Sequence, residues 1–245
     1  GDGEQVKSTA RLLCPMAMVA SCAGWDTPYV RRTCKVLANN SSVMALGAVI
    51  GSSAAATAEA GNVVDKVTAL HEAVGTSEHP ATELVLTRRC ADVAKLTYTM
   101  RCSGDRLDKQ VLDKFDTSLR TALERTLGGS LRDSSWWQAT IAASEGGLGM
   151  REASAVSLPA FLASRITSRP LALEMAQHAV DADLLTHSLY AEAYDARTRA
   201  AFDSMCQSLP VEVRDVLRLI AEEGAAAAAE RWSVLRQGLP ENRAQ

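Results

Sequence analysis

Four basic side chains near the middle of the chain could contact phosphate: Arg88, Arg89, Lys95 and Arg101. Guanidinium and ammonium groups are the usual protein partners of the phosphate oxygens in nucleic acids. These four alternate along the chain with carboxylates such as Asp92. Mixed charges of this kind are also typical of a solvated helix surface with many ion pairs. The four residues are therefore candidates for nucleic-acid contact, and a solvated surface is the alternative interpretation.

Three tryptophans are candidates for an interface: Trp25, Trp136 and Trp137. An indole ring can stack on a base or pack against a protein partner. Adjacent residues of a helix point about 100° apart. We therefore expect one member of the pair Trp136–Trp137 in the core and the other near the surface or a partner.

The sequence Gly47 to Ser53 follows an apolar run and precedes a helical pattern, which is the setting of a phosphate-binding loop. That motif needs four residues between its glycines and then a lysine. Here three residues separate Gly47 from Gly51 and no lysine follows. A tight turn is the better interpretation.

Other catalytic and metal-binding patterns are missing from the sequence. The four histidines do not form HExxH and do not pair with cysteine at ligand spacing. They are His71, His79, His178 and His187. No two aspartates are adjacent, and the six cysteines form no CxxC pair, so we interpret the cysteines as buried free thiols. We predict no enzymatic activity, no metal and no cofactor.

The composition favours helices and excludes a strongly basic protein. Hydrophobic residues make up 47% and aromatic residues 4% of the 245 residues, with alanine and leucine abundant. Helices accept this composition more readily than β-sandwiches do. The formal net charge of -3 gives no overall electrostatic case for nucleic acid or an anionic membrane. Binding to either would need a local basic patch.

These side chains must be positioned by helices, of which the clearest covers residues 105–127. Its apolar residues recur every three to five positions, and Gly128 is suited to end it in the left-handed conformation. Ser135 and Gln138 have the spacing of a capping box that would begin the next helix. Helices are also predicted over 52–74, with an interruption near Gly61, and over 81–102. The apolar run Val43–Ile50 is the one credible β element.

The two ends of the chain are also predicted to be helical. Residues 4–23 are expected to form a helix weakened at Pro15. Its apolar part, Leu12–Gly24, is too short to span a bilayer but could lie on a membrane surface. Downstream, helices are predicted over residues 153–166, from Pro170 to His178, over 183–207, and in a last segment through Arg236. The fold class is therefore a mainly α bundle of about seven or eight helices. We divide it into residues 1–40 (N-terminal helix and loop), 41–180, and 181–245, whose helices are expected to pack on the same core.

Several segments, in order, resemble the region after the catalytic palm in non-LTR retroelement reverse transcriptases, particularly those of dinoflagellates and other microalgae. The stretch Val43–Ser52 is similar to that family's strand and turn, and Leu86–Arg101 resembles its following helix. The pattern continues from Phe115 through Trp137 to Gly146–Arg151, and the resemblance covers about residues 34–180. It implies that residues 41–180 form a thumb-like helical domain.

In that family the thumb lies against the template–primer duplex, and the catalytic Tyr-X-Asp-Asp turn lies upstream of it. Residues 1–33 contain no such motif, so the resemblance does not carry polymerisation to this chain.

Two functional hypotheses follow. The leading one is a non-catalytic helical interaction or scaffold subunit of a larger, organellar assembly, derived from a retroelement reading frame of an alga, with protein subunits as partners. The alternative is a nucleic-acid-binding thumb fragment of a reverse transcriptase, with RNA or DNA as partner.

Overall fold

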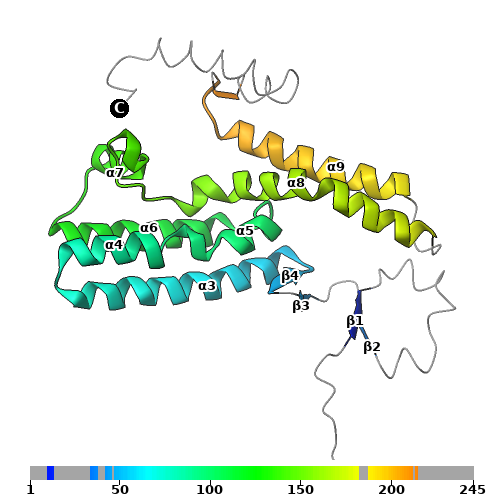
Figure 1. The fold of residues 1–245 in the computed structure, drawn as a ribbon, viewed down its shortest axis with the longest axis horizontal. Coiled ribbons are helices and arrows are strands. Elements are labelled where there is room, and N and C mark those ends of the chain that lie inside the picture. Colours follow the sequence, from blue (N-terminus) through cyan, green and yellow to red (C-terminus); the bar gives the residue numbers. More distant parts are fainter. Residues whose placement is uncertain are drawn as a thin grey trace, which may run out of the picture.

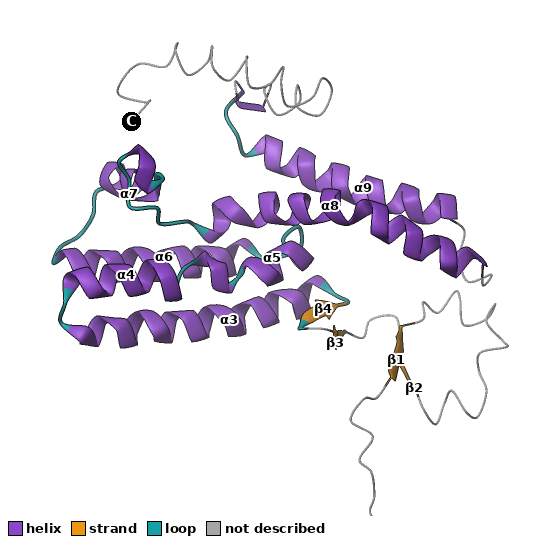
Figure 2. Ribbon diagram, in the orientation of Figure 1, coloured by secondary structure: helices purple, strands orange, loops and turns teal. Residues whose placement is uncertain are grey.

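The computed structural model describes residues 10–13, 34–37, 42–45, 47–181, 187–211 and 213–214. This part of the chain is mostly helical, as the sequence predicts. Helices α3 to α6 lie side by side in Figure 1; α8 lies above them, in contact with α5 and α6, and α9 packs on α8. Figure 2 shows strands β3 and β4 at the start of α3, where β4 contacts α3 and α5.

The elements have the following bounds. The strands are β1 (Ala10–Leu13), β2 (Cys34–Leu37), β3 (Val43–Ala45) and β4 (Ala48–Ile50). The α-helices are α3 (Ser53–Val74), α4 (Pro80–Cys90), α5 (Thr97–Ser103), α6 (Lys109–Leu127), α7 (Asp133–Thr140), α8 (Ala153–Asp181) and α9 (His187–Gln207). Short 3-10 turns are η1 (Gly75–Ser77), η2 (Val93–Lys95) and η3 (Ala143–Glu145).

The predicted β element at residues 43–50 is confirmed as a hairpin. Strands β3 and β4 pair antiparallel, with Val43 opposite Ile50 and Ala45 opposite Ala48. Gly47 has a positive φ of 80°, a backbone conformation that glycine adopts without steric cost. Residues 47–53 therefore comprise the hairpin turn at Gly47, strand β4 and a short turn at Gly51 that leads into α3.

The predicted N-terminal helix over residues 4–23 is wrong where the structure describes this segment. Ala10–Leu13 is a strand, β1, which pairs in parallel with β2 in the register Ala10 to Cys34. Pro15 gives a physical reason, because a helix over these residues would need a backbone N–H at position 15 to bond to the Arg11 carbonyl, and proline has none. Leu12 and Leu13 of the proposed membrane-surface segment Leu12–Gly24 belong to β1, and the rest of that segment lies outside the described residues.

Helix α6 provides the centre of the main core. Phe115, Leu119 and Leu123 are fully buried and repeat at helical spacing, as predicted. They pack with Val64 and Val67 of α3. Helix α6 begins at Lys109, because Asp108 is its N-cap and accepts a hydrogen bond from the Gln110 backbone N–H. It ends at Gly128, whose φ of 73° is the predicted left-handed cap.

The predicted helix over residues 81–102 is instead broken into α4, η2 and α5. The break begins at Ala91, whose carbonyl accepts a hydrogen bond from His71 Nε2 at 2.8 Å. In a continuous helix that carbonyl would bind a backbone N–H four residues later. The next residue, Asp92, is buried and bound by Arg151. Two partners distant in sequence therefore stabilise the break.

The predicted separation of residues 153–166 from a helix beginning at Pro170 is also wrong. Helix α8 is continuous from Ala153 to Asp181 and contains both Pro159 and Pro170. Each proline removes one backbone hydrogen bond. Packing of α8 against α5 and α9 accompanies the continuous helix. Helix α9 agrees with the prediction for residues 183–207, and the last predicted helix lies outside the described residues apart from 211, 213 and 214.

The start of α7 also differs from the prediction. The helix begins at Asp133 with Arg132 as N-cap, so Ser135 lies inside the first turn and does not cap it. Asp133 accepts a hydrogen bond from Arg120 at 2.9 Å, and a carboxylate in the first turn is favoured by the helix dipole. This ion pair, together with the position of Asp133, favours the earlier start.

Candidate anion-binding site

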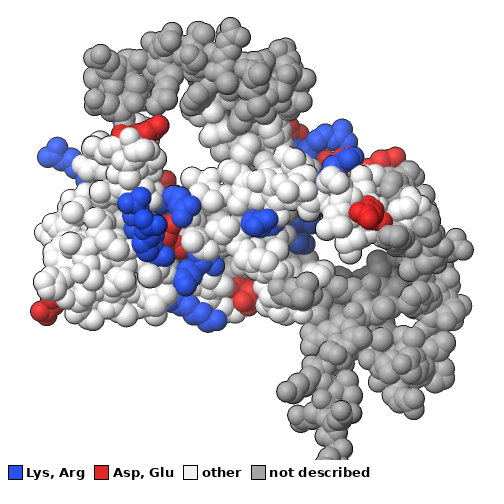
Figure 3. Space-filling view, viewed as in Figure 1, with Lys and Arg blue, Asp and Glu red and all other residues white. Residues whose placement is uncertain are grey.

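A pocket of about 550 Å³ lies where the end of α4 meets the segment from α7 to α8. Figure 3 shows blue side chains gathered on this face, between α4, α7 and the start of α8, with red atoms among them. We call it the arginine pocket. It is lined by Arg88, Arg89, Asp92, Thr140, Ala142, Ala143, Ser144, Gly149 and Arg151.

Helix α4 positions Arg88 and Arg89. Pro80 opens the helix, where its fixed φ suits the first turn. In its last turn Thr87 is buried, Arg88 is half-buried and Arg89 is exposed. Cationic side chains at this end complement the negative end of the helix dipole. The break at residue 91 thus leaves two guanidinium groups at the edge of the pocket.

A glycine turn positions Arg151. Gly146 and Gly149 have positive φ values of 88° and 68°, which other residues rarely adopt. A Cβ added to Gly147 would lie 2.0 Å from the carbonyl oxygen of Ile141, so the chain approaches too closely for a side chain. The Gly149 N–H donates to the same carbonyl at 2.8 Å. The turn therefore folds back onto the end of α7 and brings Arg151 to the pocket.

The pocket carries three arginines against one carboxylate. Arg151 donates to Asp92 Oδ2 through Nε at 3.1 Å and also through Nη2. Arg88 and Arg89 have no ion-pair partner among the residues that the structure describes. Because Asp92 already pairs with Arg151, two positive charges remain to attract an anion. A guanidinium binds phosphate or carboxylate oxygens through paired N–H groups.

The structure brings together two of the four residues proposed for nucleic-acid contact. Arg88 and Arg89 line the pocket, whereas Lys95 in η2 and Arg101 in α5 are exposed and do not line it. Sequence reasoning missed Arg151 as a site residue, although it ends the motif Gly146–Arg151. The glycine turn before it was the available signal, because such a turn returns the chain toward the preceding helix.

The two adjacent tryptophans differ in burial, as predicted. Trp136 is 7% exposed, and its Nε1 donates to Glu152 Oε1 at 2.8 Å. Trp137 is 50% exposed. Trp137 is therefore the member of the pair that a ligand or partner can reach, and Trp25 lies outside the described residues.

A second pocket of about 370 Å³ lies between α3 and α6 and contains His71. The Nε2 atom of His71 must carry the proton, since its partner, the Ala91 carbonyl, can only accept. Nδ1 then accepts from the Ser118 hydroxyl at 2.8 Å. Both nitrogens are satisfied, and burial lowers the pKa of His71, so the imidazole is neutral at pH 7. We interpret this pair as a link between α3, α6 and the break after α4.

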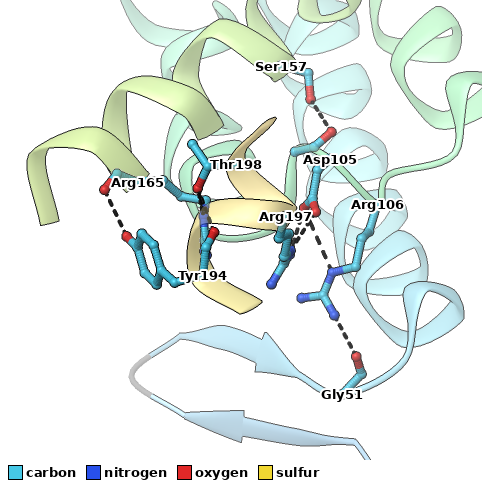
Figure 4. Close-up of polar contacts among 9 residues, drawn as sticks. Gly51, Asp105, Arg106, Ser157, Arg165, Tyr194, Arg197 and Thr198 are labelled. Atoms are coloured by element: carbon cyan, nitrogen blue, oxygen red, sulfur yellow. Dashed lines mark hydrogen bonds and ion pairs between the residues drawn. The ribbon is translucent and has the colours of Figure 1, made fainter. Parts of the chain in front are cut away.

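Figure 4 shows a second group of arginines, which connects α9 to the rest of the helices. Arg197 of α9 binds both oxygens of Asp105, at 2.6 and 2.7 Å. Arg106 donates to the Gly51 carbonyl at 2.8 Å, and Arg165 donates to the Tyr194 carbonyl at the same distance. Each guanidinium has a partner within the chain. This group is therefore better explained as a structural network than as an anion site.

Comparison with protein-family models, curated proteins and solved structures gives no match to this chain. Among the described residues, no three His, Cys, Asp or Glu side chains are grouped so that they could hold a metal ion. No described helix is long and apolar enough to cross a membrane.

Proposed function

We propose that this chain is a non-catalytic helical domain that binds the phosphate backbone of a nucleic acid at the arginine pocket. The observation that supports this function is the convergence of Arg88, Arg89 and Arg151 on one pocket with a single carboxylate. A local excess of positive charge can bind a polyanion even though the whole chain has a net charge of -3. The resemblance to the thumb of retroelement reverse transcriptases supports the same class of ligand.

Binding to a labelled oligonucleotide tests this proposal. We expect affinity to fall as salt increases, since arginine–phosphate contacts release counterions. The double variant Arg88→Ala/Arg89→Ala should weaken binding about tenfold or more and should flatten the salt dependence, since about two phosphate contacts are lost.

A matched control removes two other positive charges. Lys109 and Arg199 are exposed and do not line the pocket. Lys109→Ala/Arg199→Ala should therefore retain most of the affinity. If neither RNA nor DNA bound at low salt, or if the two double variants lost affinity equally, the arginine pocket would not be the binding site.

A second candidate function is that of a helical interaction or scaffold subunit, and exposed apolar side chains on α8 favour it. Ile166, Leu171 and Met175 are each more than half exposed. Leu171 and Met175 are four residues apart and so share one helix face. A protein partner that covered this face would bury them.

Native purification distinguishes the two functions. A scaffold subunit should co-purify with a stable protein partner, and Leu171→Ser/Met175→Ser should release it. A well-folded monomer with no stable partner in native pull-downs would contradict this second function.

A further inference from the structure

The exposed indole of Trp137 lies on the helix that forms one wall of the arginine pocket. Thr140, which lines the pocket, is three residues further along α7, so the two side chains lie on neighbouring parts of the same helix surface. The Thr140 hydroxyl donates to the Trp137 carbonyl at 2.7 Å. A half-exposed aromatic ring thus lies about one helical turn from Thr140, which lines the arginine pocket.

Helix α7 is held firmly against the pocket. The backbone N–H groups of Leu148 and Met150 both donate to the Ala139 carbonyl, at 3.2 and 3.0 Å. Trp136, about 100° around the helix from Trp137, holds α7 through its hydrogen bond to Glu152 and a contact with the Arg120 guanidinium. These contacts fix the backbone that carries Trp137. A ring on a fixed backbone loses little conformational entropy when it binds a ligand.

We infer that the arginine pocket and Trp137 together bind an unpaired stretch of nucleic acid, with phosphates at Arg88 and Arg89 and a base stacked on the Trp137 indole. This inference rests on the proposed function and specifies that the bound nucleic acid is single-stranded. Aromatic platforms beside positively charged grooves suit single strands, because every unpaired base offers a face on which a ring can stack. In a duplex those faces are covered by neighbouring base pairs.

Fluorescence anisotropy with a labelled 12-nucleotide single strand, and with the 12-base-pair duplex that contains it, tests the inference on the full chain. We expect the single strand to bind more tightly than the duplex. Trp137→Ala should weaken single-strand binding roughly 5- to 100-fold, whereas Trp137→Phe should weaken it less, because a phenyl ring still stacks. Binding of the duplex should hardly change in either variant.

Leu127→Ala is the matched control, since Leu127 is a large apolar residue on α6 that is also half exposed. It should leave single-strand binding unchanged. Circular dichroism of each variant checks that the fold is retained.

The outcomes separate the inference from the proposed function. The inference would be overturned if the duplex bound as tightly as the single strand or more tightly, or if Trp137→Ala bound the single strand like the wild type. Neither result would contradict nucleic-acid binding at the arginine pocket. The second of these results is also expected if Trp137 serves a protein partner. If neither strand bound, or if binding did not depend on Arg88 and Arg89, the proposed function would fail as well.

Discussion

At the scale of single residues, His71 shows how a buried polar group is satisfied. Its two ring nitrogens bind the Ala91 carbonyl and the Ser118 hydroxyl, and its own carbonyl accepts from Arg125 at 2.6 Å. Burial is the main cause of its lowered pKa, and the positive charge of Arg125 acts in the same direction. A protonated ring could not accept from Ser118. The fold is therefore built around the neutral imidazole.

Acid should weaken the fold through His71. Because its pKa in the folded chain is below the ordinary 6.5, the unfolded chain takes up the proton first as pH falls. The free energy of unfolding should therefore be highest above about pH 6.5 and should decrease below it, until the folded state is also protonated. Urea unfolding at pH 7.5 and pH 5.5 measures the difference.

The variant His71→Gln makes this prediction specific. At pH 7.5 it should be less stable by about 1–3 kcal/mol, because buried hydrogen-bonding groups lose their partner. Its stability should depend less on pH than that of the wild type. His79 is exposed, so His79→Gln should keep the wild-type dependence. If the stability of His71→Gln depended on pH as that of the wild type does, His71 would not be the cause of the loss of stability in acid.

At the scale of elements, the glycine turn after η3 determines where Arg151 lies. The turn depends on two positive φ values and on close contact between Gly147 and Ile141. The residues next to it continue into α8, whose first N–H groups are capped by Asp116 of α6. Burial is the main cause that raises the pKa of Asp116. The arginine pocket therefore depends on contacts that hold α6, α7 and α8 together.

Gly147→Ala should destabilise the chain by more than about 2 kcal/mol, because the added Cβ would overlap backbone atoms. It should also weaken oligonucleotide binding, because Arg151 would move. Gly129→Ala is the matched control, since nothing lies within 4 Å of a Cβ at that position. Its stability should stay within about 0.5 kcal/mol of the wild type. Chemical denaturation of both variants checks the difference, and equal stabilities would show that the turn tolerates a side chain.

At the scale of the whole molecule, α9 is attached differently from α3 to α6. The main core joins α3 to α7 and the start of α8 through apolar side chains. Helix α9 packs on α8 through a small separate cluster containing Phe161, Leu162 and Ala201. The Arg197 guanidinium lies 5.0 Å from the centre of the Phe161 ring and binds Asp105. Two ion pairs, Arg197–Asp105 and Arg169–Asp195, thus accompany the small apolar contact of α9.

Arg197→Ala should loosen α9 without unfolding the main core. The variant loses two charged hydrogen bonds to Asp105, a largely buried carboxylate, and we expect a cost of about 1.5–3 kcal/mol. Hydrogen exchange should accelerate in peptides from residues 187–207 and should change little in α3 and α6. Arg199→Ala, at an exposed position two residues away, is the control. Uniform acceleration along the whole chain would show instead that α9 and the main core unfold together.

Much of the fold could be predicted because its signals are local. The apolar period of α6, the glycine that ends it and the turn within the β3–β4 hairpin each depend on a few neighbouring residues. Arg88 and Arg89 could be named as candidates for phosphate contact from their type alone. The opposite burial of Trp136 and Trp137 follows from the 100° step between helical neighbours.

Other features were decided by tertiary contacts. Residues 91–96 have no local signal for a break, and their partners His71 and Arg151 are about 20 and 59 residues away. Helix α8 continues through two prolines while packed on other helices. The sequence by itself therefore determined the helical class and the residue types available for binding anions. Only the tertiary structure decided which of these residues share a pocket. The reason is that contacts between residues distant in sequence, such as His71 with Ala91 and Arg151 with Asp92, end the helix and pair the charges.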